Sequence, residues 1–191
     1  MVAVWGIRLG AFLFIRIGKM KRDKRFDGRR ESFTRFLSFW ILQGLTVGIV
    51  LIPALFFMAK ETKQTLNIGV VIWLIGFIIE SIADAQKFKF TQDPLNKGKF
   101  IDRGMWKISR HPNYFGEILI WIGIYLYVFQ SFSDIEKLWT LIGPVFIIVL
   151  LLFVSGIPTV EKRAKEKFGD DPAYVAYKRR TSLLIPWFKK R

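Results

Sequence analysis

The stretch FLSFWILQGLTVGIVLIPALFFMA, from Phe36 to Ala59, decides the fold class, because it contains no charged residue. A helix rises about 1.5 Å per residue, so a run of this length can cross the roughly 30 Å hydrocarbon core of a bilayer. Four further apolar stretches have comparable lengths, namely Val2–Gly18, Leu66–Ala83, Tyr114–Gln130 and Leu138–Pro158. The sequence therefore predicts an all-α fold, a polytopic membrane helix bundle of about five transmembrane helices.

The first of these stretches is the least apolar, because Arg8 and Arg16 interrupt it. It does not have the pattern of a signal peptide, since its positive charge is not confined to its start and no small-residue cleavage site follows. We expect a first helix whose arginines either snorkel to the membrane surface or pair with acids inside the bundle. Without internal repeats or a Ser/Gly-rich linker, residues 1–191 read as a single membrane domain.

The distribution of charge predicts the orientation in the membrane. The net charge is +15, and segments 19–35, 84–113 and 159–191 hold 25 of the 30 Lys and Arg residues. With five spans these three segments fall on one face, which the positive-inside rule makes cytoplasmic. The N-terminus is then outside and the C-terminus is cytoplasmic.

Composition also excludes several classes of function. The charge is explained by topology and by anionic lipid headgroups, and no RNA-reading or helix-turn-helix motif is present, so we expect no nucleic-acid partner. With no cysteine and a single histidine, His111, the chain lacks the usual ligands of a metal centre, and we expect none. It also has neither a Walker loop nor a G-x-G-x-x-G motif.

Two carboxyl groups lie close to or inside predicted spans, Glu80 and Glu117. Pro112 suits the first turn of a helix, so Asn113 and Tyr114 would share a face with Glu117 at spacings of i, i+4 and i, i+3. Arg110 and His111 would stand at the N-terminus of that helix, which already favours anions. The residues alone leave two interpretations open: a route from cofactor to substrate, or a capped helix start with interface anchors. The surrounding basic residues likewise suit either a phosphorylated cofactor or a lipid-facing collar.

The run GMWKISRHPNYFGEILIW, from Gly104 to Trp121, resembles the signature of the steroid 5-alpha-reductase C-terminal-domain family, and is closest to its uncharacterised bacterial members. The similarity extends to the segments 80–90 and 155–163 and to the ending 174–187, and so covers nearly the whole chain. The family is related to sterol reductases and to isoprenylcysteine carboxyl methyltransferases.

The resemblance implies an integral multi-pass membrane enzyme, an oxidoreductase that acts on a CH–CH group. Such an enzyme binds NADPH from the cytoplasm and reduces a C=C bond conjugated to a carbonyl in a steroid-like or other lipid substrate. By position, the resemblance assigns to the cofactor Asp84, Lys87, Arg110, His111, Asn113, Arg163, Tyr177, Arg179 and Arg180.

The same resemblance assigns the catalytic role to Glu117, paired with a tyrosine, for which Tyr114 is the adjacent candidate. Hydride would reach the β-carbon of the substrate while a neutral acid or phenol hydrogen-bonds the carbonyl oxygen. Reductases of this family usually carry further N-terminal spans, so we expect either a piece of such a reductase or a short form with another substrate.

Two rival interpretations remain. Residues 110–116 also match the core of isoprenylcysteine carboxyl methyltransferases, which bind S-adenosylmethionine, although those enzymes usually have paired glutamates where this chain has only Glu161. The third interpretation is a non-catalytic lipid- or sterol-binding membrane protein, which would have no need of an acid at Glu117.

Overall fold

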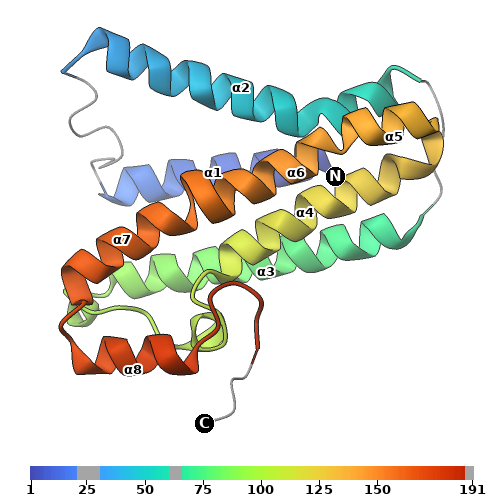
Figure 1. The fold of residues 1–191 in the computed structure, drawn as a ribbon. Helices are drawn as coiled ribbons and strands as arrows, with labels where there is room; N and C mark the ends of the chain where they lie inside the picture. The colour runs from blue at the N-terminus through green and yellow to red at the C-terminus, as the bar shows by residue number, and fades with distance from the viewer. Residues whose placement is uncertain (21–30, 61–65, 188–191) are drawn as a thin grey trace.

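The computed structural model describes residues 1–20, 31–60 and 66–187, and this part of the chain is helical without a strand (Figure 1). Short 3-10 turns occur at Pro94–Asn96, Gly104–Lys107 and Phe129–Ser131. The helices are α1 Val2–Met20, α2 Phe33–Met58, α3 Ile68–Gln92, α4 Pro112–Val128, α5 Asp134–Thr140, α6 Ile142–Val149, α7 Ile157–Phe168 and α8 Pro172–Arg180. The predicted all-α class is confirmed.

Four helical segments are long and apolar enough to cross a membrane: Phe33–Met58, Ile68–Gln92, Pro112–Ser131 and Asp134–Phe168. The predicted first span forms a helix, α1, but it carries three basic residues and is not among the four. The four segments support an integral, multi-pass membrane protein.

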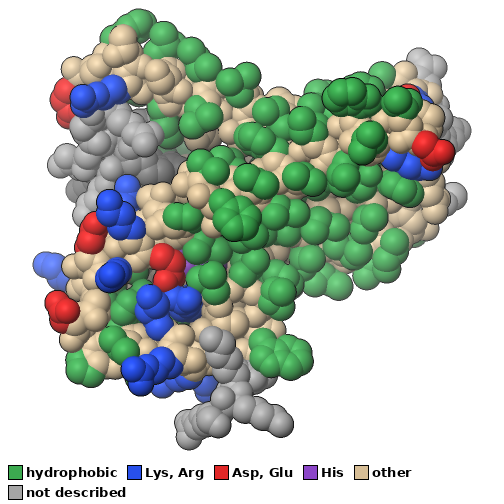
Figure 2. All heavy atoms as spheres, viewed as in Figure 1, with side chains coloured by type: hydrophobic (Ala, Val, Ile, Leu, Met, Phe, Trp, Pro, Cys, Tyr) green, Lys and Arg blue, Asp and Glu red, His purple; other side chains and the backbone are tan. Residues whose placement is uncertain are grey.

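The described parts of the three basic segments gather at one end of the bundle, where α1, α3 and α7 end and α8 lies (Figure 1). Most of the lysine and arginine side chains visible in the space-filling view lie at this end, and apolar side chains cover much of the remainder (Figure 2). The clustering expected from the charge distribution is therefore present, while the placement of this end in the cytoplasm stays a prediction.

The last predicted span, Leu138–Pro158, is not one uninterrupted α-helix. It is divided among α5, α6 and a π-helical turn at Leu150–Val154, which leads through Gly156 into α7. Pro158 stands in the first turn of α7, where a missing backbone N–H costs no hydrogen bond. The interruption lets the polar helix α7 begin at the basic end of the bundle.

The antiparallel pair α3 and α4 forms the centre of the bundle, and glycines bring the two backbones together. A Cβ atom at Gly76 would lie 2.6 Å from the Gly116 carbonyl oxygen, and one at Gly123 would lie 2.6 Å from the Trp73 amide nitrogen. Such approach is typical of membrane helices, where small residues permit tight van der Waals packing. The core around this pair is completed from α2 and α6 by Val50 and Ile147.

Gly44 and Gly48 of α2 have the GxxxG spacing of a helix-packing motif, but they form no such interface in the described part of the chain. A Cβ atom at Gly44 or at Gly48 would meet no atom within 4 Å. The spacing of two glycines alone therefore does not identify the helix face that meets a neighbour.

We predict that Gly123→Ala destabilises the protein, whereas Gly44→Ala does not. The added methyl group at position 123 meets backbone atoms of α3, which cannot rotate away, so a cost of about 1–3 kcal/mol is expected. Thermal unfolding of the detergent-solubilised variants measures the difference. Equal midpoints for the two variants would contradict the close approach of α3 and α4.

Candidate functional site

A buried cluster of charges ties α1 to α3. The Arg8 guanidinium forms an ion pair with the Glu80 carboxylate and lies 3.2 Å from Asp84 Oδ2. Trp5 Nε1 donates a hydrogen bond of 3.2 Å to the other Glu80 oxygen. The sequence predicted that the arginines of the first helix either snorkel or pair with acids inside the bundle. Arg8 pairs with acids.

On the basic side of this ion cluster lies a cavity of about 260 Å³, here called the charged cavity. It brings together four of the residues singled out in the sequence, from two helices that are adjacent in the core. Its full lining is Phe12 and Arg16 of α1, Asp84, Lys87, Phe88 and Thr91 of α3, and Asn113 and Tyr114 of α4. The Lys87 ammonium also lies 4.3 Å from the centre of the Trp106 ring, which contributes a cation–π contact.

On the other side of the ion cluster lies a cavity of about 270 Å³, here called the apolar cavity, and Glu117 is on its wall. The carboxyl group of Glu117 makes no hydrogen bond or ion pair with another residue of the described chain. The other lining residues are mostly apolar: Val2, Trp5, Gly6 and Leu9 of α1, Gln43, Thr46, Val47, Val50 and Leu51 of α2, Trp121 of α4 and Ile147 of α6.

Tyr114 and Glu117 therefore do not share one cavity, although they lie on successive turns of α4. The helix spacing correctly placed these groups near one another. It did not reveal that the ion cluster of α1 and α3 lies beside them.

Glu161 of α7 binds the two side chains that precede α4, Arg110 and His111. Its carboxylate accepts a hydrogen bond of 2.6 Å from Arg110 and one of 2.9 Å from His111 Nε2, and Lys178 Nζ lies at 3.5 Å. Arg110 and His111 are neighbours in the chain, whereas Glu161 and Lys178 come from α7 and α8. The Arg110 charge, which the resemblance assigned to the cofactor, thus already faces a carboxylate, and His111 hydrogen-bonds the same group.

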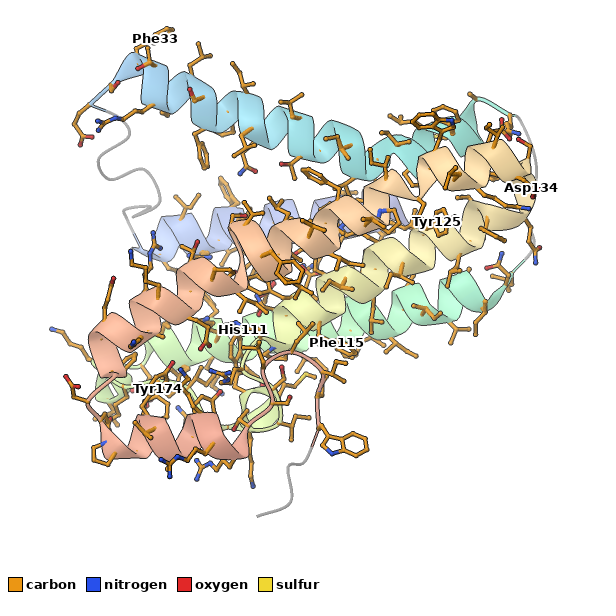
Figure 3. All side chains as sticks on the ribbon, viewed as in Figure 1. Phe33, His111, Phe115, Tyr125, Asp134 and Tyr174 are labelled. Carbon is orange, nitrogen blue, oxygen red and sulfur yellow. The ribbon has the colours of Figure 1, made fainter. Side chains whose placement is uncertain are left out.

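A third cavity, of about 200 Å³, lies beside this cluster and shares Lys87 and Thr91 with the charged cavity. The His111 ring, on its wall, stacks on the Tyr114 ring with centroids 5.6 Å apart. Figure 3 shows His111 at the start of α4 on the side facing Tyr174 of α8. The two cavities are therefore neighbours at the basic end of the bundle.

The C-terminal segment fixes the start of α4. The Arg110 amide donates to the Ser182 carbonyl at 2.9 Å, and Ser109 Oγ donates to the Leu184 carbonyl at 2.6 Å. Pro112 occupies the first turn of α4, as predicted. Residues 181–187 thus hold the loop that carries Arg110 and His111.

The remaining predicted cofactor residues, Tyr177, Arg163, Arg179 and Arg180, do not line the charged cavity. The Tyr177 hydroxyl donates to the Trp106 carbonyl at 2.7 Å, and burial raises the pKa of this phenol, so Tyr177 serves the packing of α8 as well as the wall of the third cavity. Arg180 pairs with Asp102 at 3.0 Å. Arg163 and Arg179 are exposed, and neither lines the three cavities, although the Arg163 charge acts on the Tyr114 phenol.

The sequence did not predict that Arg16 lines the charged cavity or that Trp5 hydrogen-bonds Glu80. It also did not predict that Glu161 binds Arg110, His111 and Lys178 together. One available signal was the pair of acids at positions 80 and 84, which need a counter-charge if they lie within a span. Arg8 of the first helix is the basic residue that supplies it.

Comparison with known proteins shows that the chain belongs to the family described as "Protein of unknown function (DUF1295)", whose model matches residues 1–181. An uncharacterised protein of Schizosaccharomyces pombe is 25% identical over 62% of this chain and 38% of its own length. A protein of Ustilaginoidea virens named probable O-methyltransferase ustE is 35% identical over 24% of this chain and 16% of its own length. The chain thus matches well under half the length of these relatives. No solved structure matches.

We predict that His111 titrates below pH 6.5, its ordinary value. Burial lowers the pKa of His111 because it disfavours the imidazolium, and the hydrogen bond that His111 donates to Glu161 opposes this shift only in part. Below pH 6.5 the unfolded chain then binds more protons at this site than the native protein, so its contribution to stability falls as the pH falls. As His111 is the only histidine, ¹³C-histidine labelling and NMR titration in micelles give its pKa directly.

The Glu161→Gln variant should lower the pKa of His111 further, since it removes the carboxylate that favours the imidazolium. Glu166→Gln changes an exposed carboxyl group of the same helix and is the matched control. A His111 pKa at or above 6.5 in the unmodified protein would contradict the burial of this ring.

Proposed function

We propose that this protein is a membrane-embedded NADPH-dependent reductase of a conjugated C=C bond in a lipid-like substrate. The observation that carries the proposal is the pairing of two cavities along α4, a charged one at Asn113 and Tyr114 and an apolar one at Glu117. A polar cofactor and an apolar substrate need two such environments side by side. The resemblance to the steroid 5-alpha-reductase family supports the same assignment.

The charged cavity and the third cavity have the donor set that a phosphorylated dinucleotide needs. Arg16 and Lys87 line the charged cavity, and Lys87 also lines the third cavity. The acid beside them, Asp84, neutralises them only in part because it already pairs with Arg8. Lysine and arginine bind phosphate oxygens through charge-assisted hydrogen bonds, and Asn113 offers an amide for a sugar or carboxamide. In this proposal Arg16 and Lys87 replace Arg110 as the principal phosphate ligands, because Glu161 compensates Arg110.

NADPH would supply the hydride, and the residues of this chain would prepare the substrate to receive it. Glu117 lines the apolar cavity without a partner, and a carboxyl group in such surroundings is least costly in its protonated form. A protonated Glu117 can donate a hydrogen bond to the substrate carbonyl and stabilise the negative charge that develops on its oxygen. Tyr114, one turn away on α4, lines the charged cavity and would be a phenol donor on the cofactor side.

The basic end of the bundle would face the cytoplasm, where NADPH is available. The apolar cavity is lined largely by α1 and α2, and its lining residues Gly6, Gln43 and Val47 are exposed. A lipid-like substrate can then reach Glu117 from the bilayer while the cofactor enters from the aqueous side.

A second candidate function is S-adenosylmethionine-dependent methyl transfer to a lipid-like substrate. It is favoured by the similarity to the protein named probable O-methyltransferase and by the Arg-His-Pro core that Glu161 binds. The electrostatics of the charged cavity favour the reductase, because S-adenosylmethionine carries a cationic sulfonium whereas NADPH carries phosphates. Two cations and one partly compensated acid suit the phosphates better.

We predict that the detergent-solubilised protein binds NADPH, that Asn113→Ala weakens this binding, and that S-adenosylmethionine binds more weakly. Isothermal calorimetry with the two cofactors side by side measures all three. Lys162→Gln, at an exposed position of α7 outside the cavities, controls for loss of general positive charge.

Binding of S-adenosylmethionine in preference to NADPH would support the methyltransferase interpretation. Binding of neither cofactor would leave the non-catalytic lipid-binding interpretation. In both cases the reductase proposal would be wrong.

We predict that Glu117→Gln lowers turnover of enone lipids by about 10²–10³-fold while NADPH binding is retained, because the charged cavity is unchanged. Oxidation of NADPH with a panel of lipids that carry a conjugated carbonyl measures turnover, and Glu166→Gln is the matched glutamate control. Full turnover in Glu117→Gln would remove Glu117 from the mechanism.

A further inference from the structure

A fourth cavity lies at the end of α3, next to the third cavity, with which it shares Phe90 and Ile101. It has a volume of about 680 Å³, the largest of the four cavities described here. It is formed between the end of α3 and the loop that leads toward α4, and its lining residues are Gln86, Lys89, Phe90, Gln92, Asp93, Ile101, Arg103 and Gly104. None of these residues lines the charged or the apolar cavity.

The polar groups of this cavity suit an anion. Lys89 and Arg103 are exposed, and neither forms an ion pair with a carboxylate of the described chain. Arg103 lies 4.9 Å from the centre of the Phe90 ring, a contact that orients the guanidinium without neutralising it. The acid in the lining, Asp93, already accepts hydrogen bonds from the Leu95 amide at 2.9 Å and the Asn96 side chain at 3.2 Å.

The position of the cavity along α3 matches the headgroup layer of a bilayer. The apolar part of α3 ends at Ala83, and Lys89 follows six residues later, about 9 Å along the helix axis. The hydrocarbon core is roughly 30 Å thick and the whole bilayer about 40–45 Å, so each headgroup layer is several ångströms deep. Lys89 is therefore placed where lipid phosphates lie.

An exposed apolar stripe on α3 leads directly to this cavity. Val71, Ile75, Ile78 and Ile82 are 50%, 47%, 52% and 43% exposed. At 100° per residue these four positions and Lys89 fall on one face of the helix. Acyl chains that lie along the stripe would bring a headgroup to Lys89 and Arg103.

We propose that this cavity, together with the stripe, is a binding site for an anionic phospholipid of the surrounding bilayer. The phosphate is held by Lys89 and Arg103, the headgroup lies against the amides of Gln86 and Gln92, and the acyl chains pack on the isoleucines of α3. Lys89 and Arg103 line none of the proposed cofactor and substrate cavities, and the lipid site does not rest on the proposed function.

Native mass spectrometry of the full-length protein, titrated with dioleoyl phosphatidylglycerol, tests the site. Each cation near a lipid surface contributes about 1 kcal/mol, so Lys89→Gln/Arg103→Gln should weaken binding roughly thirtyfold. Lys162→Gln/Lys165→Gln removes two exposed cations of α7 and is the matched control, expected to bind as the unmodified protein does. Thermal unfolding without added lipid verifies that both double variants are folded.

Two further measurements separate the lipid from other sources of phosphate. Ile78→Ser/Ile82→Ser should weaken binding of phosphatidylglycerol, and soluble glycerol 3-phosphate should not compete with it. The proposal is overturned if Lys89→Gln/Arg103→Gln leaves lipid binding intact, or if the α7 double variant weakens lipid binding equally. It is also overturned if glycerol 3-phosphate displaces the lipid at similar concentrations. Equal binding of zwitterionic dioleoyl phosphatidylcholine would also overturn it.

Discussion

The buried charge of Arg8 is the constraint on which the arrangement of the site depends. Moving a guanidinium out of water is costly, and the cost is offset here only because Glu80 and Asp84 face it from α3 and Trp5 completes the hydrogen bonding of Glu80. Removal of one member of such a cluster leaves an uncompensated charge and typically costs 3–5 kcal/mol. The cluster therefore fixes both the depth and the rotation of α1 against the core pair.

This fixed α1 divides the interior into two environments. Phe12 and Arg16, beyond Arg8, reach the charged cavity, whereas Gly6 and Leu9 line the apolar one. Helix α4 runs past the same boundary, and Tyr114 and Glu117 lie on either side of it. In the proposed function, this layer of paired charges would keep a water-soluble cofactor and a lipid-soluble substrate apart, with one helical turn between Tyr114 and Glu117.

The sequence predicts those features that depend on local pattern. Apolar runs indicated the spans, and Pro112 indicated the start of α4. The spacing predicted that Asn113 and Tyr114 share a face with Glu117, whereas Glu117 lines a different cavity from the other two. Features that depend on which helices meet were not predictable. The motif at Gly44 and Gly48 has the spacing of a packing interface but faces open space, whereas Gly76 and Gly123, seven or more residues from the next glycine on their helices, are the positions where backbones touch.

Glu161 changes which residues are free to bind a phosphate in the proposed function. In sequence, Arg110 and His111 stand at a helix start and suit an anion, and nothing near them in the chain neutralises them. In space the anion is Glu161, delivered by a helix that begins 46 residues later, and it binds both together with Lys178. The positive charge left for a ligand then belongs to Arg16 and Lys87, which face the charged cavity. A carboxylate that holds one group of cations together thus shifts the expected phosphate site toward α1 and α3, away from the motif that first suggested it.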